Sequence, residues 1–93
     1  MAAKEGDRMT QPLTMYTTPW CGYCRRLKNQ LAREGIEITE VDIERDPAAC
    51  EYVMTVNGGN QTVPTVLFAD GSSLTNPSVR AVKERIAELA VTP

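Results

Sequence analysis

The spacing of apolar residues near the start of the chain predicts a strand followed by a helix. Residues 13–17 form a short, largely apolar stretch, which is typical of a strand. Apolar side chains then recur every third or fourth position, and this period predicts a helix over residues 22–34. The residues with this spacing are Cys24, Leu27 and Leu31. Gly35 follows them where a helix C-cap favours left-handed backbone.

The next apolar residues predict a second strand and a second helix. The strand runs from Ile36 to Ile43, although its alternation of apolar and polar residues is irregular at Thr39-Glu40. Asp46-Pro47 marks the start of the helix, because Asp is a good N-cap and Pro fits the first helical position. The apolar face of this helix consists of Ala49, Tyr52, Val53 and Val56. We expect it to end before the loop Asn57-Gly58-Gly59-Asn60.

The last third of the chain predicts a hairpin and a final helix. Residues 63–69 form the third strand, with Pro64 near its start, and Asp70-Gly71 is typical of a hairpin turn. A short fourth strand is expected at residues 72–75. Asn76-Pro77 repeats the combination of capping residue and proline and is expected to open the last helix. The core-facing residues of that helix are Val79, Val82, Ile86 and Leu89.

These elements have the order βαβαββα, which predicts an α/β fold. We expect one domain over residues 12–93, preceded by a flexible N-terminal tail over residues 1–11. A chain of 93 residues can bury one modest hydrophobic core. Its net charge of −2 and pI near 5.0 give no electrostatic reason to expect binding to nucleic acid or to a membrane surface.

The cysteine and histidine content bears on compartment and chemistry. Residues 1–11 are polar and lack the apolar segment of a signal peptide, and no segment is long enough to cross a bilayer. Three cysteines is an odd number, so we expect a reducing, cytoplasmic setting and no structural disulfide framework. The sequence has no histidine, which removes the commonest general base and the commonest zinc ligand.

The main candidate for chemistry is the pentapeptide Trp-Cys-Gly-Tyr-Cys at residues 20–24. Cys21 precedes the first helix, where unpaired backbone N–H groups and the helix dipole stabilise an anion. A thiolate is favoured there, and the thiolate is the nucleophilic form of cysteine. A strand, a CxxC motif and a helix in this order predict a thiol–disulfide redox site. We expect Cys21 to be the exposed nucleophile and Cys24, one turn into the helix, to be the less accessible resolving thiol.

Other interpretations of the cysteines are weaker or remain open. A structural zinc site would need a second pair of ligands, but only Cys50 remains, so no metal is expected. Cys50 lies beside the apolar face of the second helix, where a free cysteine is usually a small buried hydrophobe. A redox role for Cys50 is the alternative. Glu40, Asp42, Glu44 and Asp46 are expected to be solvated or capping groups and no acid–base pair.

The residues around the motif have both structural and functional interpretations. Trp20 is either a packing residue or a platform for substrate, and Tyr23 is either a surface aromatic or a contact for the thiol ligand. Arg25 and Arg26 are either solvated helix charges or cations that help to hold the thiolate of Cys21.

Strand, CxxC and helix, then Thr62-Val63-Pro64 before a hairpin and a final helix, resemble the glutaredoxin family over residues 12–90. The resemblance implies a thioredoxin fold, with a four-stranded mixed sheet flanked by three helices. It also implies a cis peptide bond before Pro64, facing the active-site cysteines. The backbone of Val63 would then present its N–H and C=O to an extended, peptide-like thiol, in the manner of strand addition.

Within this family the chain is most similar to the mycoredoxins of actinobacteria. The similarity lies in the pentapeptide at residues 20–24, the loop at residues 57–60 and the segment Leu74-Thr75-Asn76-Pro77-Ser78. It implies reduction of mixed disulfides between proteins and mycothiol through Cys21, by a monomer. The small thiol is a co-substrate and no cofactor is needed. The residues it places at the substrate are Trp20, Tyr23, Arg25, Thr62, Val63, Pro64, Thr75, Asn76 and Ser78.

The sequence departs from glutathione-using members of the family. Those commonly carry a basic residue before the CxxC motif, a Gly-Gly pair after the last strand and acidic residues at the start of the last helix. This chain has neutral residues at these places, among them Thr75, Asn76 and Ser78. Mycothiol is a neutral sugar conjugate, whereas glutathione carries two carboxylates, so the neutral residues favour mycothiol.

Three alternative functions stay open at this point. The chain also resembles redoxins that donate electrons to ribonucleotide reductase and are recharged by thioredoxin reductase, but those carry Gly-Phe-Arg-Pro-Asp where this chain has residues 74–78. A module that bridges a [2Fe–2S] cluster through Cys21 and external thiols is the second. An interaction domain with a vestigial CxxC motif is the third, and the intact cysteine pair counts against it.

Overall fold

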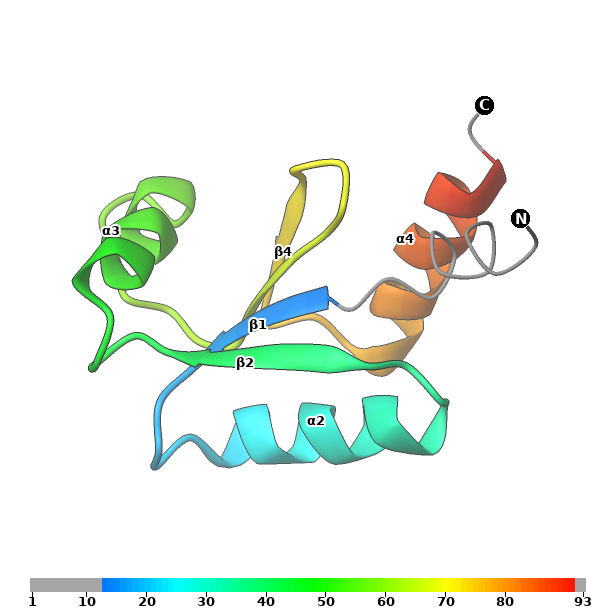
Figure 1. Cartoon of the computed structure of the whole chain (residues 1–93), viewed down its shortest axis with the longest axis horizontal. Helices are drawn as coiled ribbons and strands as arrows, with labels where there is room; N and C mark the ends of the chain where they lie inside the picture. Colours follow the sequence, from blue (N-terminus) through cyan, green and yellow to red (C-terminus); the bar gives the residue numbers. More distant parts are fainter. Residues whose placement is uncertain (1–12, 92–93) are drawn as a thin grey trace.

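The computed structural model describes residues 13–91, and the predicted tail over residues 1–11 lies outside this range. The elements follow the predicted order (Figure 1). They are β1 (Leu13–Thr17), α2 (Gly22–Arg33), β2 (Ile38–Asp42), α3 (Pro47–Val56), β3 (Thr65–Leu67), β4 (Ser73–Thr75) and α4 (Val79–Val91). None of the three helices in the described part has the length and apolar character needed to cross a membrane.

The four strands form one mixed sheet with the order β2-β1-β3-β4. β1 pairs in parallel with β2 and antiparallel with β3, and β3 pairs antiparallel with β4. Figure 1 shows α2 and α3 on opposite sides of the strands. The topology and the three flanking helices confirm the predicted thioredoxin fold.

Alternation along the central strands divides the core into two clusters, one on each face of the sheet. Met15 of β1 lies opposite Val66 of β3, and both are fully buried in the larger cluster with α2 and α4. Tyr16, the next residue along β1, belongs to the smaller cluster under α3. Its ring centroid is 5.2 Å from that of Tyr52. Burial is the main cause that raises the pKa of the Tyr16 phenol above its ordinary value, and the charges of Tyr52 and Asp46 raise it further.

The end of α2 shows why β2 is shorter than predicted. The Gly35 N–H donates to the Ala32 carbonyl and the Ile36 N–H donates to the Leu31 carbonyl, at 3.0 and 2.9 Å. With Gly35 at φ +74°, this is a Schellman motif, so the predicted glycine cap is confirmed. Because the N–H of Ile36 closes the helix, it is not available to the sheet, and β2 begins at Ile38.

The two predicted helix starts had different outcomes. Asp46 caps α3 as predicted, with its Oδ1 accepting the Ala49 N–H at 3.1 Å. The prediction that Asn76 opens the last helix was wrong, because Ser78 accepts the Ala81 N–H at 3.0 Å and α4 begins at Val79. Asn76 instead has φ +49°, a left-handed conformation that asparagine tolerates better than most residues. It forms the turn between β4 and the helix.

The hairpin of β3 and β4 is held against α4 by Arg85. Its Nη1 donates to Ser72 Oγ at 2.7 Å, and its guanidinium lies 5.5 Å from the ring centroid of Phe68. Asp70 accepts hydrogen bonds from the Ser72 N–H and hydroxyl at 3.0 and 2.6 Å, and these bonds lower the pKa of Asp70. The predicted strand over 63–69 is only Thr65–Leu67, because the turn begins at Phe68, whose N–H donates to the Ser72 carbonyl.

We predict that Arg85→Ala lowers the free energy of unfolding by about 1–2 kcal/mol, through loss of the hydrogen bond to Ser72 and of the contact with Phe68. Arg80→Ala is the matched control, because Arg80 is 86% exposed and, among the residues that the structure describes, pairs only with Glu84. The control should change stability by no more than about 0.5 kcal/mol. Urea unfolding of the oxidised proteins measures both, and equal values would contradict the role given to Arg85.

Candidate active site

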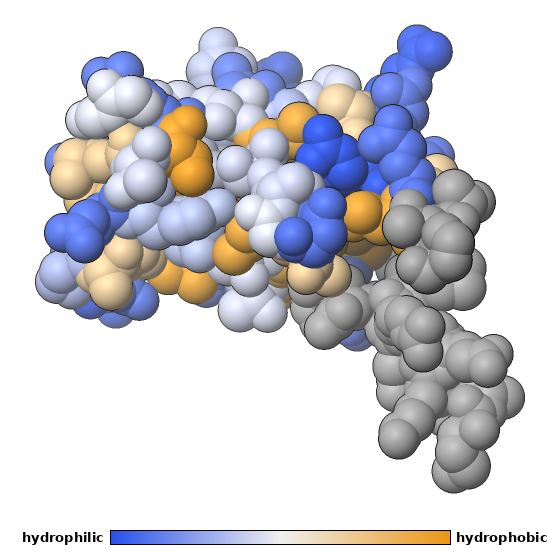
Figure 2. Space-filling view, turned by 90° about the horizontal axis from the view of Figure 1, so that it is seen from above, coloured by the Kyte–Doolittle hydropathy of each residue, from blue (hydrophilic) through white to orange (hydrophobic). Residues whose placement is uncertain are grey.

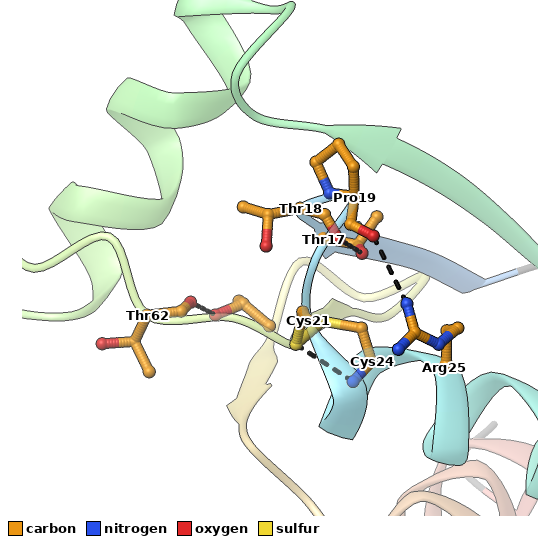
Figure 3. Close-up of a disulfide and its surroundings, with 8 residues drawn as sticks. Thr17, Thr18, Pro19, Cys21, Cys24, Arg25 and Thr62 are labelled. Carbon is orange, nitrogen blue, oxygen red and sulfur yellow. Dashed lines mark hydrogen bonds between the residues drawn. A yellow bond between two sulfur atoms is a disulfide. The ribbon is translucent and has the colours of Figure 1, made fainter.

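The cysteine pair lies at the beginning of α2 and is joined by a disulfide (Figure 3). Cys21 is the N-cap, with extended backbone at φ −88° and ψ 107°. Its Sγ accepts the backbone N–H of Cys24 at 3.1 Å. The sulfur thus takes the place that an oxygen of Ser or Asp takes in an ordinary cap. Electron density that develops on Cys21 Sγ is therefore stabilised by an N–H group of the first helical turn.

The loop before α2 is folded back onto the helix. The Cys21 N–H donates to the Thr18 carbonyl at 3.3 Å, and Arg25 Nη1 donates to the Pro19 carbonyl at 3.4 Å. Figure 3 shows the Arg25 guanidinium on the side of Pro19, with the disulfide below the loop. Arg25 therefore braces the loop that carries Cys21, in addition to being an exposed charge.

The two cysteines and their neighbours differ in exposure. Cys21 is 8% exposed and Cys24 is 1% exposed, so the order is as predicted but the expectation of an openly exposed Cys21 was wrong. Both sulfurs belong to the larger core cluster, because the helix cap places them against the sheet. Trp20 and Tyr23 are 70% and 67% exposed. The packing interpretation of Trp20 was therefore wrong, and the motif has an exposed aromatic residue beside each cysteine.

The Thr62-Val63-Pro64 segment faces the cysteine loop. The predicted cis peptide bond between Val63 and Pro64 is present, and Pro64 is fully buried. Val63 packs against the cluster that contains Cys21, and Figure 3 shows Thr62 across from the disulfide. Within residues 13–91 the N–H and C=O of Val63 have no hydrogen-bond partner. These two groups are available to an extended ligand.

The turn between β4 and α4 lies next to this segment. The Asn76 N–H donates to the Pro64 carbonyl at 2.7 Å. Thr75 and Asn76 are thereby brought to the cis-proline segment. Ser78 is exposed, and its oxygen already accepts the Ala81 N–H. Asn57 and Thr65 were not predicted as site residues, and their side chains connect Thr75 to Thr62 by hydrogen bonds.

The other predicted groups form ion pairs or pack outside the larger cluster. Glu40 pairs with Lys28 at 3.0 Å and Asp42 with Arg45 at 3.8 Å, as expected of surface carboxylates. Cys50 is a half-buried free thiol packed against the smaller cluster. No group of three or more potential metal ligands occurs in the described part of the chain.

Two adjacent threonines end the strand that leads to the motif, and their hydroxyls differ in hydrogen bonding. Thr17 is 8% exposed, and its hydroxyl donates to the Thr18 carbonyl at 3.1 Å. Thr18 is 6% exposed, and its buried Oγ1 has no partner in the described structure. Figure 3 shows this hydroxyl between the cysteine loop and the Thr62 segment.

Apolar residues on the surface do not gather into one continuous area on the face seen in Figure 2. They form separate patches interrupted by polar residues. The two most exposed large hydrophobic residues among those described are Trp20 and Tyr23, both within the motif. Exposed aromatic area is thus concentrated at the cysteines.

The chain is similar to known proteins along most of its length. The family model for glutaredoxin matches residues 13–73. A protein of Mycobacterium tuberculosis named as a glutaredoxin is 58% identical over 82 residues, covering 88% of this chain and 98% of that protein. Mycoredoxin 1 of Corynebacterium glutamicum is 44% identical over 78 residues, covering 84% and 96%. The crystal structure of a glutaredoxin from Archaeoglobus fulgidus superposes with a TM-score of 0.64 at 26% identity, over 77% of this chain and 82% of that one.

We predict that Thr18→Val raises the free energy of unfolding of the oxidised protein by about 1 kcal/mol, because it removes a buried hydroxyl that has no partner. Thr17→Val is the matched control at the neighbouring buried position, and it should lower stability by about 1 kcal/mol through loss of the bond to the Thr18 carbonyl. Urea unfolding measures both values. A loss of stability in Thr18→Val would show that its hydroxyl is satisfied in solution.

Proposed function

The chain belongs to the glutaredoxin family, a family of thiol–disulfide oxidoreductases, and on this premise we propose that it reduces mixed disulfides between proteins and mycothiol. The observation that carries the proposal is the position of Cys21. Its sulfur caps α2, and Val63, whose backbone N–H and C=O are unpaired within residues 13–91, packs against the cluster that contains Cys21, so a nucleophile and a binding edge for an extended thiol are brought together.

Cys21 is the nucleophile in this proposal. The reduced chain presents the Cys21 thiolate, which attacks the mycothiol sulfur of the mixed disulfide. A new S–S bond forms between Cys21 and mycothiol, the original S–S bond breaks, and the target protein leaves as a thiolate that takes a proton from water. Support comes from the Cys24 N–H at 3.1 Å from Cys21 Sγ and from the greater exposure of Cys21.

The adduct on Cys21 can be resolved in two ways. A second mycothiol attacks the bound mycothiol sulfur, which releases a mycothiol disulfide and regenerates the Cys21 thiolate. Alternatively, Cys24 attacks Cys21, which releases mycothiol and forms the Cys21–Cys24 disulfide. Two further thiols then reduce that disulfide. Either cycle needs only the small thiol as co-substrate, and no metal or prosthetic group takes part.

The ligand contacts are assigned by their place around Cys21. The N–H and C=O of Val63 pair with the ligand backbone, in the manner of an added strand, with Thr62 and Pro64 on either side. Thr75, Asn76 and Ser78 contact the far end of the ligand, and Trp20 and Tyr23 flank its entry. Arg25 holds the loop in place through the Pro19 carbonyl, and its exposed charge lies near the thiolate.

Mycothiol is preferred because the groups assigned to the far end of the ligand are neutral. Thr75, Asn76 and Ser78 offer hydroxyl and amide groups and carry no charge. A ligand rich in hydroxyl groups can hydrogen bond to them, whereas the carboxylates of glutathione find no cation among these three. The similarity to Mycoredoxin 1 supports the same choice.

We predict that Cys21→Ser abolishes turnover, because a serine hydroxyl does not ionise at neutral pH and the chain has no histidine to activate it. Cys24→Ser should keep activity on small mixed disulfides and should accumulate the adduct on Cys21. Mass spectrometry of the protein quenched during turnover measures the adduct. An active Cys21→Ser protein with an adduct on Cys24 would reverse the assignment.

We predict a lower KM for mycothiol than for glutathione with similar kcat, because the sulfur chemistry is common to both thiols. Ser78→Asp should then improve the use of glutathione roughly two- to fivefold, by giving its ammonium group an exposed ionic partner. Asp also caps helices well, so α4 should remain intact. Ser78→Asn is the neutral control. Equal KM values for the two thiols in the unmodified protein would contradict the mycothiol preference but leave the glutaredoxin assignment in place. An assay with thioredoxin reductase as the electron source tests the alternative redoxin function.

A further inference from the structure

Asn57, at the end of α3, joins three parts of the structure through its side chain. Its Nδ2 donates to the Val53 carbonyl at 2.8 Å and to Thr65 Oγ1 of β3 at 3.1 Å. Its Oδ1 accepts the hydroxyl of Thr75, at the end of β4, at 2.5 Å. Both N–H donors of the amide are thus in use, and its oxygen accepts one hydrogen bond.

The donor and the acceptor of each of these hydrogen bonds can be assigned from the groups involved. The Val53 carbonyl can only accept, so the NH₂ group of Asn57 must face α3 and β3, and the amide oxygen must face Thr75. Thr65 accepts from Asn57 and donates its own proton to the Thr62 carbonyl at 2.8 Å. The donors therefore all point the same way, from Thr75 through Asn57 and Thr65 to the Thr62 carbonyl, so each hydrogen bond polarises the next.

The two ends of this sequence are the two segments that surround the open backbone of Val63. The Thr62 carbonyl is taken by Thr65, and the Pro64 carbonyl is taken by the Asn76 N–H at 2.7 Å. Because both neighbouring carbonyls are occupied, the C=O of Val63 is the backbone acceptor left open in this segment within residues 13–91, and the N–H of Val63 is open beside it. The loop that contains Asn57 thus determines which backbone groups a ligand meets.

We propose that Asn57 is a positioning residue for the small-thiol site, which holds the Thr62–Pro64 segment and Thr75 at a fixed separation. This inference rests on the proposed function. It also assigns a polarity to Thr75: its proton is committed to Asn57, so its oxygen meets a ligand as an acceptor only. Thr75 therefore selects a thiol that brings a hydroxyl or N–H donor to this point and disfavours one that brings a carboxylate.

A purely structural role for Asn57 makes a different prediction. Asn57 is the C-cap of α3, and its bond to Val53 stabilises the end of that helix. If this were its whole contribution, its substitution would lower stability and leave the KM for the thiol unchanged. The KM, measured separately from kcat and from the unfolding midpoint, distinguishes the two roles.

The test is Asn57→Asp in the full chain, with mycothiol and glutathione as the thiols. The carboxylate cannot donate to Thr65, whose hydroxyl can then turn away from the Thr62 carbonyl. We expect the KM for mycothiol to rise about tenfold, as for the loss of a hydrogen bond in the site, with kcat within about twofold. The alkylation rate of Cys21 in the reduced protein should stay unchanged, because its helix cap is untouched.

The matched control is Asn60→Asp, the same change of charge in the same loop. Asn60 is exposed, and its Nδ2 donates to the Asn57 carbonyl at 3.2 Å, its one side-chain hydrogen bond within residues 13–91. Its KM should stay within about twofold of the unmodified protein, since a lost exposed bond contributes little. An equal rise in KM for both variants would show a general effect of charge and would overturn the positioning role.

Thr75→Val tests the other end and decides the matter if Asn57→Asp does not fold. It should raise the KM for mycothiol to a similar extent, and the double variant should raise it no further than the larger single effect. Independent, multiplying effects would overturn the proposal, as would an unchanged KM in either single variant. A lack of turnover by the unmodified chain with either thiol would overturn the proposed function itself and this inference with it.

Discussion

The site depends on the unpaired backbone N–H groups at the beginning of α2. A helix leaves its first N–H groups without partners, and this chain directs one of them, that of Cys24, at the sulfur of Cys21. The same bond caps the helix and stabilises negative charge on the sulfur. Structure and reactivity therefore have one cause, and with no histidine in the sequence the chain has no imidazole that could replace it.

Much of the architecture follows from local patterns in the sequence. The apolar period of Cys24, Leu27 and Leu31 predicted α2, and the Asp46-Pro47 pair predicted the start of α3, because caps and periodicity are properties of neighbouring residues. Asn76-Pro77 misled the same reasoning. There, Asn76 donates its N–H to Pro64, twelve residues earlier, and this contact between distant segments determined the turn.

The candidate site divides in the same way. The cysteine pair and the cis-proline segment could be predicted, the first from spacing and the second through the family resemblance. The connection through Asn57 and Thr65 could not, because its partners come from three separate parts of the chain, the end of α3, the entry into β3 and the end of β4, whose meeting depends on the whole sheet. The pattern of the loop at residues 57–60 was noticed, but nothing local shows where an asparagine side chain in a loop will point. Exposure of Cys21 was overestimated for a related reason, since the sheet beneath the helix cap covers most of it.

The small exposed fraction of Cys21 has a consequence for the choice of reaction partner. Cys21 is 8% exposed, although Trp20 and Tyr23 beside it are largely exposed, so little of its surface can be reached from solvent. The flat surface of a folded protein fits poorly over so small an area, whereas a slender group that projects from that surface can approach it. A small thiol attached to a protein is such a projection. In the reaction proposed above, limited access to Cys21 therefore favours attack on the sulfur of the small thiol, which adds a steric reason for this regiochemistry to the difference between the two leaving thiols.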